Sequence, residues 1–176
     1  YRPESYFHGS WRGSKAMDGG GALMNQGIHG VDILRYLMGP VKNVQSVVRT
    51  LLHDIEVEDA AVASLEFENG AIGVITASTA TYPGYDREIN IYGTRGGIEF
   101  KQGTMVRLVI DGDEYPCSEF TSVGDASSNL VLDYRGHARQ LGAFVRAING
   151  ENVSYPNEFD GKQAVELIET IYKSSI

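Results

Sequence analysis

The stretch DAAVASLEFENGAIGVITAST, residues 59–79, contains two runs in which apolar and polar residues alternate. Alternation with a period of two is typical of β-strands that bury one face. The two runs are joined by Glu68-Asn69-Gly70, and Asn and Gly tolerate the positive φ that a short hairpin turn requires. Because a short turn forces antiparallel pairing, the stretch predicts an antiparallel β-hairpin.

Strand-like runs of the same kind extend from Val41 to about Cys117. The predicted strands are VKNVQSVVRTL, DAAVASLEF, AIGVITAST, REINIYG, GIEFKQ, MVRLVI and DEYPC. Gly93-Thr94-Arg95-Gly96 and Asp111-Gly112-Asp113 are two further turn signals. About seven strands in succession predict one large, mostly antiparallel, open sheet.

Helical periodicity flanks the predicted sheet on both sides. A helical pattern that follows Gly21 and runs to about Met38 ends at Gly39-Pro40, because proline cannot continue a helix. Two more helices close the chain; the first ends at Asn149-Gly150, and the second has Asp160 as its candidate N-cap. Residues 1–20 show neither period and predict an extended arm or loop. Helices packed on one face of an antiparallel sheet predict an α+β fold, whose other face is solvated or covered by a partner.

The composition is that of an ordinary globular domain. The chain has 176 residues, 42% hydrophobic and 22% charged, which is enough for one domain with its own core. The formal net charge of −8 argues against nucleic acid or an anionic membrane as a partner, since both require clustered Lys and Arg. No apolar run reaches the length of a membrane span, and no signal peptide opens the chain. Cys117 is the single cysteine, so no internal disulfide forms and we expect a cytoplasmic location.

The stretch GGGALMNQGIHGVDILRYLMG, residues 19–39, carries the candidate chemistry. Asn25, His29 and Asp32 are spaced by four and three residues, so they project from one side of a helix start. Free N–H groups and the helix dipole lower the proton affinity of an imidazole there, which leaves a neutral ring that can relay a proton. Asp32 is placed to orient that ring, and Asn25 offers an amide to a substrate hydroxyl. An alternative remains open in which His29 is structural and Asn25 only caps the helix.

The pattern W-R-G at residues 11–13, followed by GGGALMNQGIH-x-x-D-x-L, resembles the motif of the glucose–fructose oxidoreductase, inositol dehydrogenase and MocA family. The similarity continues through residues 55–63 (IEVEDAAVA), 69–73 (NGAIG), 82–84 (YPG) and the closing helix pair. It covers nearly the whole chain in the expected order. The resemblance implies that residues 1–176 form a single substrate-binding and oligomerisation domain, an open sheet with helices on one face. It also implies that the N-terminal Rossmann domain, which holds NAD or NADP in the family, is missing from this chain.

The resemblance also assigns roles to the helix start. His29 matches the family's active-site histidine, which relays the proton of the substrate hydroxyl, and Asp32 matches the acidic residue one turn later. Asn25 stands where many members have Asp, a departure that leaves it a hydrogen-bonding role. The family's catalytic lysine has no counterpart here, nor does a G-x-G-x-x-G loop after a strand. We therefore expect no cofactor to bind this chain alone.

Three further residues are candidates for the substrate side of the site. Arg12 suits a phosphate or carboxylate, although a surface ion pair would explain it equally well. Tyr82 suits the lining of a pocket, although a buried tyrosine with a bonded hydroxyl is the ordinary case. His137 opens a helix, where it either faces substrate or packs and caps. His8 and His53 lie in expected loops without identifiable partners, and no metal site is expected, because hydride transfer to nicotinamide needs no metal.

The sequence as a whole predicts an oxidoreductase domain. When full length, the protein is expected to transfer hydride between NAD or NADP and a secondary alcohol of a sugar, nucleotide sugar or cyclitol. Residues 11–13 together with Met24-Asn25-Gln26 resemble the branch that acts on nucleotide-linked amino sugars. The open sheet face is expected to build a homodimer or homotetramer. Two alternatives remain, a non-catalytic ligand-sensing or regulatory homologue and a purely structural oligomerisation module.

Overall fold

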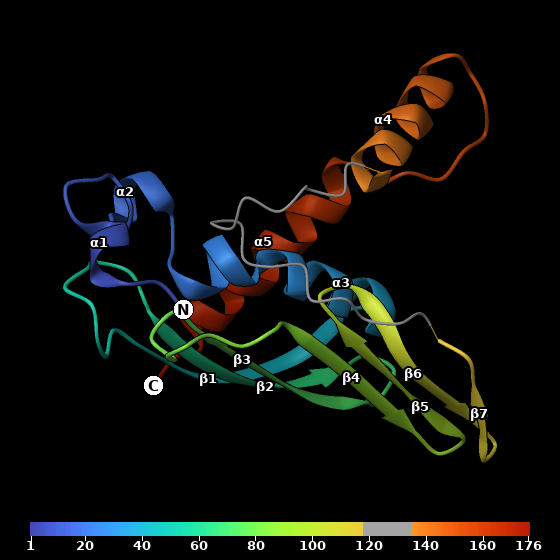
Figure 1. Cartoon of the computed structure of the whole chain (residues 1–176), viewed down its shortest axis with the longest axis horizontal. Coiled ribbons are helices and arrows are strands. Elements are labelled where there is room, and N and C mark those ends of the chain that lie inside the picture. Colours follow the sequence, from blue (N-terminus) through green and yellow to red (C-terminus); the bar gives the residue numbers. More distant parts are fainter. Residues whose placement is uncertain (118–134) are drawn as a thin grey trace.

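Residues 1–117 and 135–176, which the computed structural model describes, form an α+β fold with strands on one side and helices mainly on the other (Figure 1). This confirms the predicted fold class. All seven predicted strands are present. They are β1 (Val41–Arg49), β2 (Ala60–Phe67), β3 (Ile72–Ser78), β4 (Glu88–Gly93), β5 (Gly96–Lys101), β6 (Thr104–Ile110) and β7 (Asp113–Tyr115).

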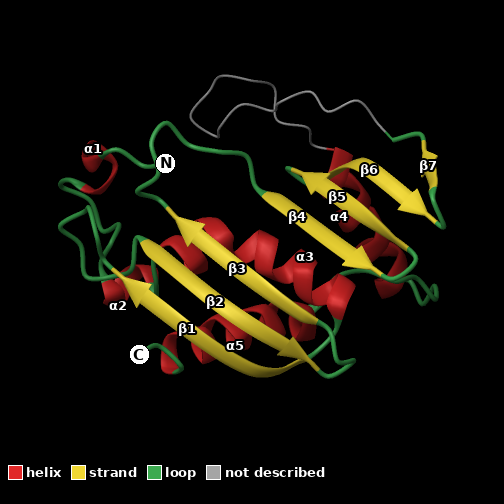
Figure 2. Ribbon diagram, turned by 90° about the horizontal axis from the view of Figure 1, so that it is seen from below, coloured by secondary structure: helices red, strands yellow, loops and turns green. Residues whose placement is uncertain are grey.

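The strands form two antiparallel sheets rather than one. Their hydrogen-bonded orders are β1-β2-β3 and β4-β5-β6-β7, and Figure 2 shows them as two separate groups of strands. The antiparallel pairing is confirmed, but the prediction of a single sheet is wrong. Short turns that enforce pairing join β2 to β3 and each successive pair of strands from β4 to β7. The connection between β3 and β4 is the longer segment of residues 79–87. This segment contains Pro83, which has no N–H to donate to a strand ladder.

The core lies between the first sheet and two helices, α3 (Ile28–Met38) and α5 (Glu158–Lys173). Alternate residues of β2 point into it, and exposure along this strand falls and rises with a period of two. Burying each large apolar side chain stabilises the fold by about 1.5–3 kcal/mol. The buried members of this core are Leu23, Val31, Ala61, Ala63, Leu65, Phe67, Leu167, Ile168 and Ile171.

The helix predicted from after Gly21 to about Met38 is divided in two. Its first part, η1 (Ala22–Gly27), is a wide π-helical turn, and the α-helical part, α3, begins only at Ile28. A π-turn is rare and is frequently found at functional sites. The division places Asn25 in the wide turn and His29 in the first turn of the α-helix that follows.

The carboxylate of Glu58 holds the start of the π-turn. It accepts the backbone N–H groups of Gly21 (2.8 Å) and Leu23 (2.9 Å), while the Ala22 N–H donates to the Glu58 carbonyl (2.9 Å). The hydroxyl of Tyr172, from α5, donates to the same carboxylate at 2.9 Å. Burial and the negative charge of Glu58 raise the pKa of Tyr172 well above its ordinary value. Glu58 is 7% exposed, so these bonds compensate an otherwise costly buried charge.

The two ends of the chain differ from the sequence prediction. The expected N-terminal arm contains two single helical turns, α1 (Glu4–Phe7) and α2 (Lys15–Asp18). The N-cap of α5 is Asn157 rather than Asp160. The Asn157 side chain accepts the Phe159 N–H (2.8 Å), and Asp160 accepts the Asn157 N–H (2.9 Å), which together make a capping box.

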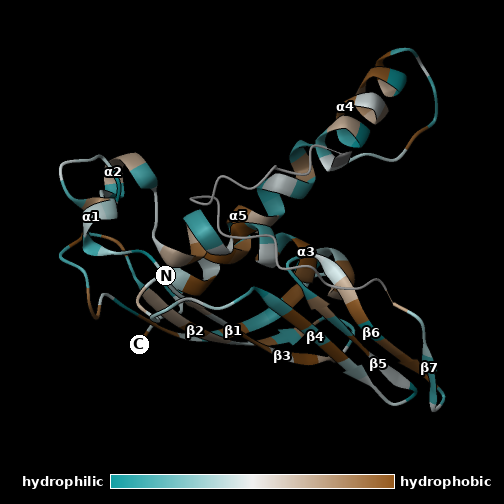
Figure 3. Cartoon of the chain, viewed as in Figure 1, coloured by the Kyte–Doolittle hydropathy of each residue, from teal (hydrophilic) through white to brown (hydrophobic). Residues whose placement is uncertain are grey.

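Helix α4 (Arg135–Ile148) does not cover the sheet as predicted. It projects from the body of the molecule (Figure 1), and apolar and polar residues both show along it in Figure 3. Its apolar stripe, Leu141, Phe144, Val145 and Ile148, is 46–68% exposed. Of the three long helices described, only α3 and α5 contribute to the core. No described helix is long and apolar enough to cross a membrane.

The contact between Gly21 and Glu58 yields a test of this architecture. A Cβ at position 21 would meet the Glu58 carbonyl oxygen, so Gly21→Ala forces the π-turn away from β2. We expect urea unfolding to show a loss of about 1–3 kcal/mol or more, as for other overpacked sites. Gly161→Ala is the control, because a Cβ at Gly161 in α5 meets nothing within 4 Å. Gly161→Ala should leave the free energy of unfolding unchanged or raise it by up to about 1 kcal/mol. Equal stability of Gly21→Ala and Gly161→Ala would contradict the tight contact between Gly21 and Glu58.

Candidate functional site

The three predicted catalytic residues lie on the solvent side of η1 and α3. Asn25, His29 and Asp32 are all exposed, whereas Leu23 and Val31 on the opposite side are in the core. The exposed His29 differs from the alternative in which this histidine is buried and structural. Within the described residues no hydrogen bond joins His29 to Asp32, so the orienting role of Asp32 stays a prediction. The structure thus presents an amide, an imidazole and a carboxylate on one open helix face.

A single carboxylate joins this helix start to the N-terminal arm. Asn25 donates from Nδ2 to Asp18 Oδ1 at 2.6 Å, and the Gly13 N–H donates to Asp18 Oδ2 at 2.5 Å. Gly13 follows Arg12 directly, so Asp18 ties the Arg12 turn to Asn25. The sequence did not single out Asp18, because the contact depends on how the arm folds back.

Arg12 lies among aromatic rings of the arm. Its guanidinium carbon is 4.6 Å from the centroid of the Tyr6 ring and 5.5 Å from that of the Trp11 ring. Stacking of this kind orients the guanidinium while leaving its N–H groups available at the edge. An open hollow beside Arg12 is lined in addition by Glu4, Phe7, His8, Gly9, Ser10, Gly13, Ser14, Asp54, Ile55 and Glu56.

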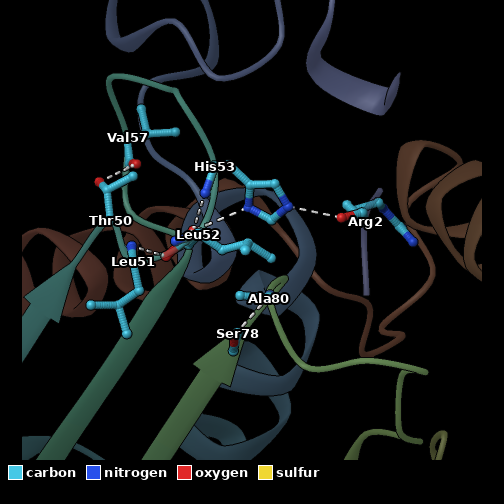
Figure 4. Close-up of polar contacts among 9 residues, drawn as sticks. Arg2, Thr50, Leu51, Leu52, His53, Val57, Ser78 and Ala80 are labelled. Carbon is cyan, nitrogen blue, oxygen red and sulfur yellow. Dashed lines mark hydrogen bonds and ion pairs between the residues drawn. The ribbon is translucent and has the colours of Figure 1, made fainter. Parts of the chain in front are cut away.

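The arm is anchored to the sheet by a buried pair that the sequence did not reveal. His53, for which no partner was identified, is 5% exposed, and its Nδ1 lies 3.1 Å from Asp59 Oδ2. Its Nε2 lies 2.9 Å from the carbonyl oxygen of Arg2, as Figure 4 shows. The Arg2 N–H donates to the Thr79 carbonyl (2.9 Å), and the Phe7 ring packs 4.8 Å from the imidazole, centroid to centroid. These contacts hold the start of the arm on the β1–β2 loop and the end of β3.

Asp59 is fully buried and organises the β1–β2 loop around itself. It accepts the backbone N–H groups of Leu51 (2.7 Å), Leu52 (2.8 Å) and His53 (2.9 Å). Burial acts to raise the pKa of Asp59, but these N–H groups and the His53 ring outweigh burial and lower it. The buried pair could have been predicted from the adjacent Glu58 and Asp59, since acidic residues directly before a buried strand require partners.

The remaining candidates lie apart from the helix face. Tyr82 is 77% exposed in the segment between β3 and β4, where its ring meets that of Tyr1 edge-on at 5.4 Å. His137 is exposed on α4. Neither shares a hydrogen bond or ring contact with Asn25 or His29 in the described part of the chain. Among the described residues, no three His, Cys, Asp or Glu side chains are grouped as metal ligands.

Comparison with known proteins identifies the family. The model of the GFO/IDH/MocA C-terminal domain matches residues 1–99, more than half of the chain. The chain therefore belongs to the GFO/IDH/MocA family, as the motif predicted.

Two relatives are named for different substrates. Myo-inositol 2-dehydrogenase of Thermotoga maritima is 31% identical over 159 residues, which cover 84% of this chain and 45% of the relative. Levoglucosan dehydrogenase of Pseudarthrobacter phenanthrenivorans is 28% identical over 116 residues, covering 52% of this chain and 30% of the relative. The chain thus spans less than half the length of either.

A solved structure with the same fold contains both a cofactor and a nucleotide sugar. The WlbA dehydrogenase from Bordetella pertussis, in complex with NADH and UDP-GlcNAcA, superposes with a TM-score of 0.78 at 28% identity. The match covers 99% of this chain and 48% of that one. Nearly all of this chain therefore corresponds to about half of that chain.

The lowered pKa of Asp59 predicts how stability depends on pH. Its contribution is fully present above the unfolded-state pKa of about 3.9 and is lost as pH falls through the lower folded-state pKa. Asp59→Asn should therefore lower the free energy of unfolding by about 3–5 kcal/mol at pH 7, as expected when one partner of a buried pair is removed. Below about pH 4 this difference from the unsubstituted chain should become smaller.

Urea unfolding between about pH 2.5 and pH 7 measures this dependence, since the range begins below the unfolded-state pKa of about 3.9, where the contribution of Asp59 starts to be lost. Asp54→Asn, at an exposed carboxylate of the same loop, is the control and should track the unsubstituted chain. A gap for Asp59→Asn that is constant across the whole range would contradict the assigned ionisation.

Proposed function

We propose that this chain is the substrate-side domain of an NAD(P)-dependent oxidoreductase acting on a secondary alcohol of a sugar, nucleotide sugar or cyclitol. The observation that carries the proposal is the exposed face of Asn25, His29 and Asp32 in a chain of this family. The names of the relatives support it, since they include dehydrogenases of inositol and levoglucosan. A cytoplasmic location, with neither nucleic acid nor membrane as a partner, accords with the net charge of −8 and the single cysteine.

The described residues do not suit a dinucleotide. The glycine run at residues 19–21 has its Gly21 N–H engaged by the Glu58 carboxylate, which would also repel a phosphate. A pyrophosphate needs free N–H groups at a helix start that follows a strand. We therefore assign NAD or NADP to a separate dinucleotide-binding half, and we expect this chain alone to be inactive and to bind neither cofactor.

The helix face supplies the proton chemistry of the proposed reaction. When an alcohol is oxidised, its carbon loses a hydride to the nicotinamide and its hydroxyl loses a proton. His29 is the group that takes this proton, and an exposed ring next to Asp32 can pass it on to water. Asn25 binds a substrate hydroxyl and so fixes the sugar relative to His29.

Arg12, Tyr82 and His137 are proposed to contact the rest of the substrate. Arg12 supplies a stacked, oriented cation, which suits a phosphate or carboxylate group of a nucleotide-linked sugar. Tyr82 and His137 are exposed and lie on the segment after β3 and on α4, so they contribute only where a ligand or another domain bridges to them.

We also propose that the chain forms a homodimer or homotetramer through the outer face of β1-β2-β3. This face is opposite the helices and presents four exposed aliphatic side chains, Val47, Val62, Ile72 and Val74. Val47 and Val62 are directly paired across the strands. Exposed apolar side chains gathered on one sheet face commonly mark an interface.

His29→Ala tests the proposed chemistry in the full-length enzyme. Loss of a positioned general acid–base should lower turnover by about 10²–10⁴-fold. Because His29 is exposed, the thermal unfolding midpoint and the affinity for NADH should hardly change. Asp113→Ala is the control, since its side chain is exposed on β7 and belongs to no part of the proposed site. Unchanged turnover in folded His29→Ala would remove the histidine from the chemistry.

Sedimentation equilibrium of the 176-residue chain tests the proposed interface. We expect association at micromolar concentration, and Val62→Lys at the centre of the outer face should shift the chain to monomer. Leu141→Lys is the matched substitution on the exposed stripe of α4 and should leave association intact. Dissociation by Leu141→Lys alone would move the interface to that helix.

A further inference from the structure

Asp18 holds Asn25 through a bond whose direction is fixed by chemistry. The two oxygens of a carboxylate only accept hydrogen bonds, and an amide has one donor end and one acceptor end. Because Asp18 Oδ1 lies 2.6 Å from the Asn25 amide, the end of that amide facing Asp18 must be the nitrogen. The other oxygen of Asp18 accepts the Gly13 N–H, so the carboxylate is fixed from both sides.

We infer that Asp18 is a positioning residue that turns the amide oxygen of Asn25 outward, so that the site selects a substrate group that donates a hydrogen bond. This inference rests on the proposed function of the helix face. The oxygen and nitrogen of an amide point in different directions, so a nitrogen held by Asp18 leaves the oxygen directed away from it. A hydroxyl or N–H group of the ligand is accepted at this oxygen, whereas a carboxylate or carbonyl oxygen is repelled.

The same contact gives a physical reason for asparagine at position 25. In Asn25→Asp, a second carboxylate would face Asp18 at hydrogen-bonding distance. Two carboxylates at this distance cannot both be ionised without a large cost in free energy. Asp18 and Asn25 are therefore a matched pair in which one residue must be the acceptor and the other the donor.

This pairing makes Asp18→Asn a sharp test. The amide that this substitution introduces still has an oxygen for the Gly13 N–H, and its nitrogen then faces Asn25. The Asn25 side chain must rotate to present its own oxygen to that nitrogen, which leaves the Asn25 nitrogen outward. Residue 18 keeps its hydrogen bonds to Gly13 and Asn25. The Asn25 amide, however, now presents a donor nitrogen to the substrate instead of an acceptor oxygen.

In the full-length enzyme we expect Asp18→Asn to lower kcat/KM about tenfold or more, the range of one lost or reversed hydrogen bond, with an unchanged unfolding midpoint. Asn25→Asp should also lower it. The exchanged pair Asp18→Asn with Asn25→Asp restores a donor facing an acceptor and again presents an oxygen outward, so it should recover to within about threefold of the original. Asp113→Asn, at an exposed carboxylate on β7, is the control.

The side-chain amide signals of Asn25 give a readout independent of turnover. In the 176-residue chain they are assigned by their loss in Asn25→Asp, and they should move when Asp18 is replaced by Asn. Asp113→Asn should leave them in place. Amide signals that do not respond to position 18 would overturn the inferred contact.

The kinetic results distinguish this inference from the function on which it rests. If His29→Ala impairs turnover and Asp18→Asn does not, the proposed function stands and the positioning role of Asp18 is wrong. If the exchanged pair fails to recover, the direction of the bond does not matter and the inference is likewise wrong. If His29→Ala has no effect, both the proposed function and the inference fail.

Discussion

The structure depends on two adjacent buried carboxylates at the start of β2. Glu58 accepts backbone N–H groups at the start of η1, and Asp59 accepts those of the β1–β2 loop and meets the ring of His53. A buried charge is costly unless it is fully hydrogen-bonded, so each carboxylate imposes one conformation on the backbone around it. Segments far apart in the sequence, the arm, the π-turn and the sheet, are thereby fixed to one another.

The consequence for the site is that its polar groups are held by the scaffold rather than by each other. Glu58 fixes the turn that carries Asn25, and His53 fixes the arm that carries Arg12. Asp18 then joins the arm to the turn. A helix face fixed in this way loses little freedom when a ligand arrives, which favours both binding and orientation. The face itself stays open, in keeping with the proposal that it meets a dinucleotide-binding half.

Local sequence patterns correctly predicted the features that depend on interactions between residues close together in the chain. Alternating residues located the seven strands, and helical spacing placed Asn25, His29 and Asp32 on one exposed side. The errors concern long-range contacts. The π-turn arises because Glu58 reaches η1 across the fold, and α4 carries an amphipathic pattern yet covers no sheet. The division into two sheets falls at residues 79–87, which join β3 to β4 without a hydrogen-bonded pair between these two strands.

The central claim is that the exposed helix face is the substrate side of a dehydrogenase site. The most direct measurement is a crystal structure of the full-length protein with NADH and a bound sugar or cyclitol. This account predicts a ring nitrogen of His29 within about 2.6–3.2 Å of the hydroxyl whose carbon faces the nicotinamide, and Asn25 accepting a hydrogen bond from the same ligand. A ligand bound elsewhere, with His29 facing bulk solvent, would contradict it.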